Sequence, residues 1–335
     1  LQTDNGQDMI SIVLPVYNGA WCIGKAIDSV LRQDGSWELI VVDDNSSDDT
    51  AEIVRSYADS RIRMLQSPAK GVTTARLHGT RSAKGEYVFY MDADDELPPG
   101  IIYRMEEICR THPLFDVVVC DIEHVYVSGT QEIQEYAHHV SSGRELFDWI
   151  VDNCTGFIWG KAIRRELILR LPYIPEKLRF CEDYLQMLQV GLLAGEVRHA
   201  EMSGYRYIQH SESVCNRRKT RREYALQFYN LGEALYRLTE MKGLALNEGP
   251  VSPAVRIKVM FLYYMRLYLA VSGGRYKDPS QLKGIYDAWL FDKSLQADPL
   301  YTTSRRRQCK LARYFAPLAA AIYVPLLRFR YKRIW

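Results

Sequence analysis

The most informative segment of this 335-residue chain is Tyr87-Val88-Phe89-Tyr90-Met91-Asp92-Ala93-Asp94-Asp95. Its first five residues are all apolar or aromatic, which is typical of a strand that is buried on both faces. Three aspartates within the next four residues repel one another unless a cation neutralises them. Helix capping and solubility are the alternatives, but Mg²⁺ or Mn²⁺ bound to carboxylate and diphosphate oxygens fits best. The segment therefore predicts a metal site at a strand end.

Strand and helix patterns alternate around this segment. The expected strands cover 10–16, 37–42, 62–65, 87–91 and 115–127, and the expected helices cover 20–33, 51–57 and 71–84. Such alternation predicts a mostly parallel sheet with right-handed crossovers. Ligands bind beyond the carboxyl ends of the strands in such sheets. A second acidic cluster, 43–49, follows the second strand, so both acidic clusters are expected in one crevice.

The pattern changes after about residue 216, where long helical spacings replace the strand signals. We therefore expect two domains: an α/β domain over residues 1–215 and a helical region over residues 216–335 that ends in a basic and apolar tail. The formal net charge of +2 argues against a nucleic-acid partner.

The cysteines and the apolar runs indicate the cellular compartment in which the protein is expected. Seven cysteines are scattered without a CxxC pair, which favours free thiols in a reducing compartment. No apolar run reaches the roughly 18 to 20 residues that a membrane-spanning helix needs. The expected location is the cytoplasm, with peripheral contact at the inner face of the membrane.

The order and spacing of four motifs resemble the family-2 inverting glycosyltransferases of the GT-A fold, over roughly residues 10–215. The motifs are Ser11-Ile12-Val13-Leu14-Pro15-Val16-Tyr17-Asn18, Val41-Val42-Asp43-Asp44-Asn45-Ser46-Ser47-Asp48, Gly71-Val72-Thr73-Thr74-Ala75-Arg76 and Gly85-Glu86 followed by the segment quoted first. The resemblance implies an α/β fold with a mixed, mostly parallel sheet between helices, followed here by a helical carboxyl-terminal extension.

The resemblance also implies roles for the residues at the strand ends. Tyr17, which follows Pro15 in the first motif, is expected to pack on the nucleotide base, and Asp44 to accept hydrogen bonds from it. Arg76 is expected near the base or the diphosphate, and Asp92 at the ribose. Asp94 would then bind the metal, either Mn²⁺ or Mg²⁺, while Asp95 would lie beside the sugar.

A catalytic base is expected at Phe180-Cys181-Glu182-Asp183-Tyr184, which opens an apolar helix. The positive end of a helix dipole keeps a carboxylate ionised there. The family carries an acidic pair at this point, with the aspartate as base, so Asp183 is the candidate and Glu182 is left for sugar or acceptor contacts. An ordinary acidic first turn is the alternative.

Three further side chains are expected to contact substrates. Trp159 and Lys161 lie in Gly156-Phe157-Ile158-Trp159-Gly160-Lys161, which resembles the acceptor side of the family. Trp159 would stack on a sugar face, with a core position as the alternative. His210 would reach the metal or a phosphate, with an ordinary surface histidine as the alternative.

These features predict a metal-dependent transferase of hexosyl or N-acetylhexosaminyl groups. It would move the sugar from a nucleotide-diphosphate donor, expected to be UDP-linked, to a hydroxyl of a glycan or lipid-linked acceptor, in the biosynthesis of a cell-surface polysaccharide. The alternatives are a nucleotidyltransferase and a non-catalytic nucleotide-sugar-binding module. A nucleotidyltransferase normally needs a glycine-rich basic loop after its first strand, and Tyr17-Asn18-Gly19-Ala20 stands there instead.

The tail Arg305–Trp335 combines basic clusters with an apolar run of about 14 residues that two prolines interrupt. This run is too short to span a bilayer, but it suits a segment lying on an anionic membrane surface. Docking on the protein core and a contact in a homo-oligomer are the alternatives.

Overall fold

The computed structural model describes residues 9–174, 178, 181–210, 220–249, 251–272, 280–314 and 319. The chain forms two compact units. The first comprises Leu1–Ile150, Thr155–Glu176 and Gln186–His210, and the second comprises Val151–Cys154, Lys177–Leu185 and Ser211–Trp335. The domain boundary expected near residue 216 stays a prediction.

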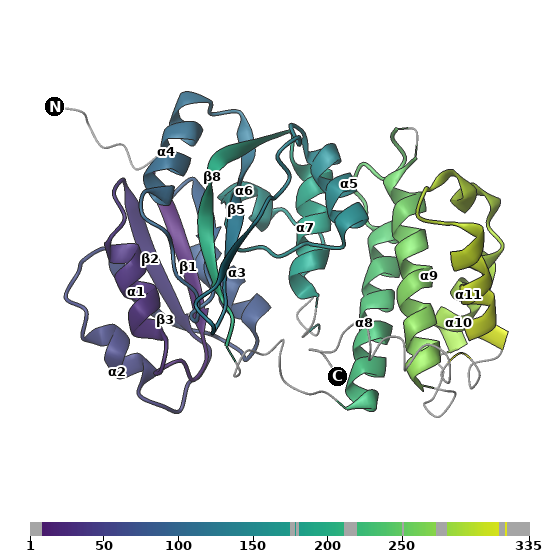
Figure 1. Cartoon of the computed structure of the whole chain (residues 1–335), viewed down its shortest axis with the longest axis horizontal. Coiled ribbons are helices and arrows are strands. Elements are labelled where there is room, and N and C mark those ends of the chain that lie inside the picture. The colour runs from purple at the N-terminus through teal and green to yellow at the C-terminus, as the bar shows by residue number, and fades with distance from the viewer. Residues whose placement is uncertain are drawn as a thin grey trace. The chain divides into compact units, whose positions relative to one another are not determined.

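The first unit is built on an eight-stranded mixed sheet, in the order β3-β2-β1-β4-β7-β5-β6 with β8 beside β5 (Figure 1). The strands are β1 (Ile10–Val16), β2 (Trp37–Asp43), β3 (Ile62–Gln66), β4 (Tyr87–Tyr90), β5 (Phe115–Val125), β6 (Gln131–Gln134), β7 (Lys161–Arg164) and β8 (Glu196–Ile208). Strands β3, β2, β1 and β4 pair in parallel, as does β8 with β5. Strand β7 pairs antiparallel with β4 and β5, and β6 pairs antiparallel with β5.

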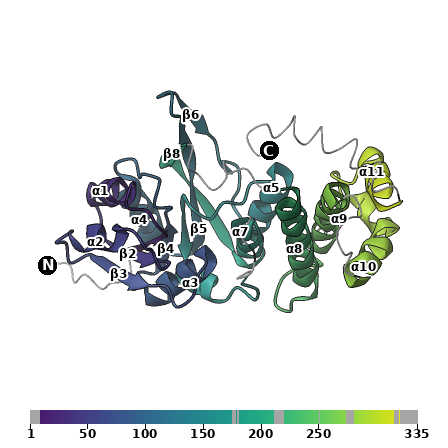
Figure 2. The same cartoon turned by 90° about the horizontal axis from the view of Figure 1, so that it is seen from below.

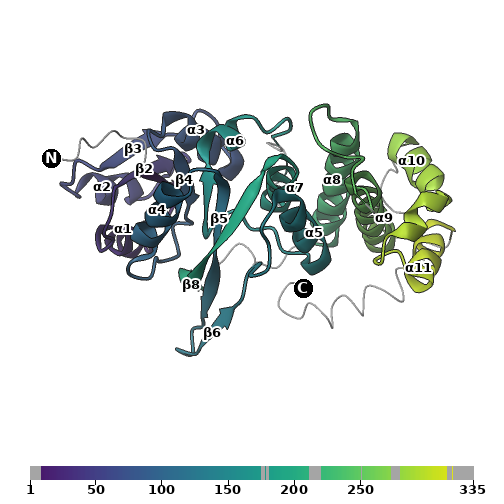
Figure 3. The same cartoon turned by 90° about the horizontal axis from the view of Figure 1, so that it is seen from above.

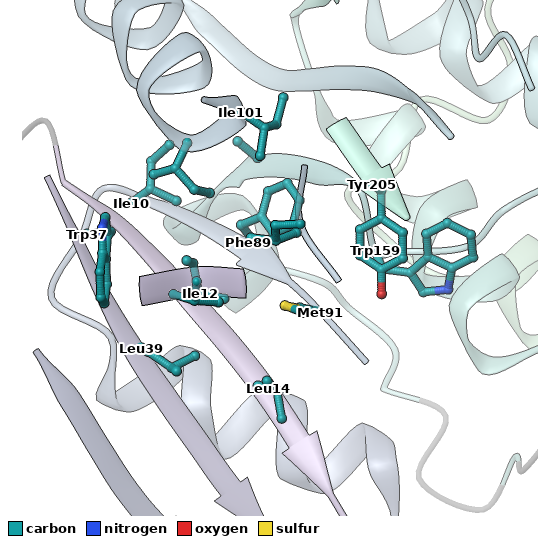
Figure 4. Close-up of a cluster of buried hydrophobic side chains, with 14 of the residues drawn as sticks. Ile10, Ile12, Leu14, Trp37, Leu39, Phe89, Met91, Ile101, Trp159 and Tyr205 are labelled. Carbon is teal, nitrogen blue, oxygen red and sulfur yellow. The ribbon is translucent and has the colours of Figure 1, made fainter. Parts of the chain in front are cut away.

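Helices cover both faces of the parallel strands. The helices within the first unit are α1 (Ile23–Leu31), α2 (Thr50–Arg55), α3 (Val72–Ser82), α4 (Ile101–Thr111) and α6 (Arg165–Leu169). Helices α5 (Gly143–Asn153) and α7 (Glu182–Leu193) have residues in both units. On one face of the sheet, side chains such as Ile12 and Phe89 pack in a core with α1 and α4 (Figure 4). On the other face α3 approaches closely at Gly79, where a Cβ atom would lie 2.5 Å from a methyl group of Val13. Gly79 therefore sets the distance between this helix and the sheet.

The carboxylate of Glu38 joins three strands near their amino-terminal ends. Its Oε1 accepts hydrogen bonds from the Ser11 hydroxyl at 2.7 Å and from the Lys84 N–H at 2.6 Å, and its Oε2 accepts from Arg63 at 2.7 Å. Burial opposes ionisation of Glu38, but the bonds from Lys84, Ser11 and Arg63 outweigh it and hold the pKa of the carboxyl below its usual value.

We expect Glu38→Gln to destabilise the first unit by about 1 to 3 kcal/mol at pH 7, because the bond to the Arg63 cation weakens in a buried site. A lowered native pKa stabilises the fold above the unfolded pKa of about 4.3, and this contribution disappears as the pH falls through the native pKa. The gap in melting temperature between wild type and variant should therefore narrow below about pH 4. Glu52→Gln, at an exposed position on α2, is the control; an equal loss in both variants would contradict the assignment.

Strands β5 and β8 form the longest ladder of the sheet, and it contains register shifts around Asp121. Figure 2 and Figure 3 show β5 continuing into β6 as a hairpin that extends beyond the other strands. The far end of β8 crosses back to the end of β4, where Glu96 and Arg206 form an isolated antiparallel bridge. This crossing brings residues 205–210 to the acidic segment after β4.

The second unit is helical over the described residues. Its helices are α8 (Arg221–Glu240), α9 (Pro253–Ser272), α10 (Ser280–Leu290), the 3₁₀ helix η1 (Lys293–Ala297) and α11 (Thr303–Tyr314). Thr220 and Glu223 form a reciprocal capping box at the start of α8. Helix α8 lies along α9, and Gly232 makes room there for the side chain of Met265. Within the described ranges, every helix is too short or too polar to serve as a membrane span.

Candidate nucleotide and metal site

The candidate site lies where three parallel strands end. Tyr17 follows β1, Asp44 follows β2, and Asp92 stands two residues after β4. Hydrogen bonds hold these ends together: the Asp44 N–H donates to Val16 O at 2.7 Å, and the Met91 N–H donates to Val13 O at 3.1 Å. The two acidic clusters therefore lie at one edge of the sheet, as the sequence predicts.

The residues predicted to hold the base differ in exposure. The ring of Tyr17 is 48% exposed, and Lys70 Nζ lies 4.1 Å from its centroid. Asp44 is buried, and each of its carboxylate oxygens accepts from the Gly71 N–H at 2.9 Å. Each oxygen offers more than one acceptor position, so Asp44 retains capacity for a ligand donor. Pro15 is buried inside β1 opposite Val42.

An ion pair links the two residues predicted for the diphosphate and the ribose. The guanidinium of Arg76 is 4% exposed and donates to Asp92 Oδ1 at 2.8 Å. Asp92 keeps 31% of its side chain exposed. A buried cation thus fixes the carboxylate of Asp92 at the rim of the site.

Asp94 and Asp95 have different surroundings although they are neighbours. Asp94 is partly exposed and meets His210 Nε2 at 2.7 Å, while burial and the nearby Asp92 carboxylate raise its pKa. Asp95 is 1% exposed, and burial together with Asp92 and Asp94 raises its pKa well above the usual range. Its oxygens accept from the Tyr205 hydroxyl at 2.7 Å and from the Ile208 N–H at 2.8 Å.

This donor set fits a hard divalent cation. Carboxylate oxygens suit Mg²⁺ and Mn²⁺, and an imidazole nitrogen is also acceptable to Mn²⁺. Asp94 and His210 would hold the ion, because their side chains already converge and neither is fully buried. The ion would offset the repulsion among the three aspartates that burial makes costly.

A second group with metal-like spacing consists of Asp121, His138 and His199, whose ligand atoms lie within 4.8 Å of one another. Both Nε2 atoms lie close to Asp121 Oδ1, at 2.7 and 3.1 Å. However, His199 Nδ1 accepts the Glu201 N–H at 2.8 Å, so Nε2 carries the ring proton. A metal at Nε2 would require the other tautomer and would set two N–H groups against each other. We therefore interpret this group as a hydrogen-bonded network.

The residues predicted for the acceptor lie inside the first unit. Trp159 is 8% exposed and stacks between Phe157, at 4.0 Å between ring centroids, and Tyr205, at 4.5 Å. Lys161 is 1% exposed, and its ammonium group donates to the carbonyls of Phe157 and Trp159 and lies over the ring of Tyr136. Trp159 thus lies in the core, which is the alternative that the sequence analysis gave for it. Direct contact of a sugar with Trp159 or Lys161 stays a prediction.

Glu182 and Asp183 form the acidic first turn of α7. Both side chains are half-buried, and both belong to the second compact unit. The first unit by itself brings together a constellation of seven of the predicted residues: Tyr17, Asp44, Arg76, Asp92, Asp94, Asp95 and His210. The roles expected for Glu182 and Asp183 stay predictions.

The sequence analysis gave no individual role to two residues at the site. Trp21, 58% exposed, places its ring 4.7 Å from that of His210. Tyr205 bonds to the acidic segment from more than 100 positions away. An aromatic residue four positions after Tyr17 was a usable signal for Trp21, whereas no local pattern pairs Tyr205 with Asp95.

Comparison with known proteins agrees with this geometry. Residues 11–170 match the family model described as glycosyl transferase family 2. The chain is 30% identical to the glycosyltransferase EpsJ of Bacillus subtilis over 225 residues, which is 62% of each protein. It is 42% identical over 89 residues to WfgD of Escherichia coli, described as a UDP-Glc:alpha-D-GlcNAc-diphosphoundecaprenol beta-1,3-glucosyltransferase; the match covers 26% of this chain and 35% of WfgD. The chain thus spans less than two thirds of these relatives.

A solved structure supplies the comparison of folds. S. aureus TarS 1–349, in complex with UDP-GlcNAc, superposes with a TM-score of 0.68 over 96% of this chain and 91% of that chain, at 17% identity. At this identity the likeness concerns the fold alone. It confirms the predicted GT-A fold with a helical carboxyl-terminal part.

Proposed function

We propose that this chain transfers a hexosyl or N-acetylhexosaminyl group from a UDP-linked donor to a glycan or lipid-linked hydroxyl, because residues 11–170 match the model of glycosyl transferase family 2. The observation that carries the proposal is the meeting of Tyr17, Asp44, Asp92 and Asp94 at one sheet edge. An exposed aromatic ring, a buried acceptor and converging carboxylates are the groups that a nucleotide diphosphate with its cation requires. The reaction would contribute to the biosynthesis of a cell-surface polysaccharide.

The proposed donor follows from this arrangement and from the relatives. The base would stack on Tyr17 and donate to Asp44, and the ribose would meet Asp92. WfgD is described as a UDP-Glc transferase, and the TarS structure is a complex with UDP-GlcNAc, which supports UDP here. WfgD also supports an acceptor carried on a lipid diphosphate.

The proposed chemistry is a single displacement with inversion. The acceptor oxygen attacks the anomeric carbon while the bond from that carbon to the diphosphate oxygen breaks. Asp183 takes the acceptor proton, and the start of α7 favours its ionised form. A bound Mn²⁺ or Mg²⁺ supplies charge stabilisation to the departing diphosphate. Asp94 and His210 would hold that ion, and Arg76 would keep Asp92 in place.

A thermal-shift panel of UDP, GDP and TDP sugars, each with and without Mn²⁺, tests the proposal. At a ligand concentration one hundred times Kd, binding stabilises the native state by about 2.7 kcal/mol. We expect a clear rise in melting temperature only with a UDP sugar and Mn²⁺ together. A response to none of the nucleotides would refute the nucleotide-sugar site. A response without turnover on any acceptor would favour a non-catalytic binding module.

Helix α11 provides a test of the proposed membrane contact. Its exposed residues include Arg305 and Arg307; the tail beyond Tyr314 lies outside the described residues except for Ala319. Each basic residue near an anionic membrane contributes about 1 kcal/mol of binding. We expect the double variant Arg305→Glu and Arg307→Glu to bind phosphatidylserine vesicles at least about tenfold more weakly in a sedimentation assay. Reversal of exposed Arg55 and Arg110 in the first unit is the matched control, and equal losses would contradict a specific contact.

A further inference from the structure

The hydroxyl of Tyr205 lies between two members of the acidic segment. It accepts a hydrogen bond from the backbone N–H of Asp92 at 3.0 Å and donates one to Asp95 Oδ2 at 2.7 Å. Its donor and one acceptor position are thus both used, and both partners belong to the loop that carries Asp94. Tyr205 is 0% exposed, so water does not replace either bond.

The ring of Tyr205 is held firmly enough to make these two bonds specific. Figure 4 shows the side chains of Trp159 and Tyr205 beside each other. The two rings stack with their planes 20° apart, and Phe89 packs nearby with 6.4 Å between ring centroids. Gly160 adopts a φ of +70°, and a Cβ atom there would come within 3.3 Å of the Tyr205 Cβ atom. The ring therefore fills a closed slot, and the hydroxyl has one position relative to β4.

Strand β8 holds the same loop at further points. The Ile208 N–H donates to Asp95 Oδ1 at 2.8 Å, and Glu96 exchanges two backbone hydrogen bonds with Arg206. These contacts fix the side chain of Asp95 and the end of the loop. Tyr205 alone among them reaches the backbone of Asp92, at the start of the loop.

We propose that Tyr205 is a positioning residue that fixes the acidic loop, so that Asp92 and Asp94 present their carboxylates to the nucleotide and its cation in one geometry. Asp95 then acts through Tyr205 and β8 and does not touch the sugar. The buried aromatic stack of Phe157, Trp159 and Tyr205 holds the ring of Tyr205, and with it the hydroxyl, in this position. This inference rests on the proposed function, because it concerns the same nucleotide and cation.

The test compares two substitutions of buried tyrosines. Tyr205→Phe removes the hydroxyl that bonds to the loop. Tyr136→Phe removes a hydroxyl that has no hydrogen-bond partner among the described residues, in the same aromatic cluster. The Kd of Mn²⁺ in the presence of UDP is measured at low temperature by electron paramagnetic resonance of free Mn²⁺. Tyr205 bonds to Asp92 and Asp95, the residues on either side of the proposed ligand Asp94. We take the loss of this support to resemble the loss of an outer partner of a metal ligand, which typically weakens metal binding about 10- to 100-fold.

We expect that weakening for Tyr205→Phe, and a Kd within about twofold of wild type for Tyr136→Phe. If Tyr205→Phe had a lower melting temperature but bound Mn²⁺ and UDP like wild type, Tyr205 would contribute only to stability, and the inference would be overturned. Equal weakening in both variants would do the same. If wild type itself bound neither UDP nor Mn²⁺, the proposed function would fail and the inference with it.

A second variant keeps the inference testable if Tyr205→Phe does not fold. Trp159→Leu removes the ring that stacks on Tyr205 and leaves the hydroxyl in place. We expect a several-fold weaker Kd for Mn²⁺ with UDP, because the hydroxyl loses its fixed position. A folded Trp159→Leu protein with an unchanged Kd would contradict the role of the stack.

Discussion

Replacing Asp183 by Asn is expected to lower kcat by about 10²- to 10⁴-fold, the range that a general base contributes. The amide keeps the shape of the side chain and its place in the first turn of α7, but it cannot take the acceptor proton. The donor is proposed to bind through Tyr17, Asp44 and the acidic loop, so its affinity should stay within about twofold of wild type. Steady-state kinetics with calorimetry of UDP–Mn²⁺ binding separates the two quantities.

The control for this prediction lies in the same compact unit. Asp287→Asn weakens an ion pair with Arg313 and should leave kcat unchanged. Full activity in Asp183→Asn would show that another group takes the proton. Comparison with Glu182→Gln then decides between the two adjacent carboxylates, because a large loss of kcat in that variant alone would move the base to Glu182.

The parallel part of the sheet is predictable from the sequence because its strands are buried on both faces. Residues 10–16 and 87–90 read as unbroken apolar runs and form β1 and β4. Strand β7 escapes prediction because its four residues begin with Lys161 and end with Arg164, so they form no apolar run. Strand β8 escapes prediction because its buried and exposed positions do not follow one period. Long-range pairing with β5 stabilises β8, and no local pattern reports such pairing.

In the candidate site, too, local sequence patterns predict some positions, while long-range contacts decide others. Tyr17 and Asp44 directly follow buried strands, and Asp92 stands two residues after one. The parallel order of these strands therefore brings the three residues together at one end of the sheet. The bond from His210 to Asp94 spans 116 positions, and the sequence analysis could only leave the role of His210 open. Neighbouring aspartates can also differ in burial, which the sequence does not reveal. Asp94 is partly exposed, whereas Asp95, the next residue, is buried against β8.

Replacing Asp94 by Asn should abolish metal-dependent donor binding. The amide can still accept from His210, so the local contact survives, but the negative charge that would bind the cation is lost. A metal interaction worth several kcal/mol corresponds to a loss in UDP affinity of about 10²-fold or more in the presence of Mn²⁺. Turnover should fall by at least as much, because the departing diphosphate loses the same stabilisation.

The decisive measurement for Asp94 is the Kd of UDP with Mn²⁺ and with a chelator. Wild type should bind UDP far more tightly with Mn²⁺, whereas Asp94→Asn should bind it equally weakly in both conditions, at the level of chelated wild type. Asp59→Asn, just before β3 and so near the opposite edge of the sheet, is the matched control and should keep the full response to Mn²⁺. A response to Mn²⁺ that survived in Asp94→Asn would move the ion to other ligands. A response lost in both variants would point to general damage, since the two positions share only the removal of one carboxylate charge.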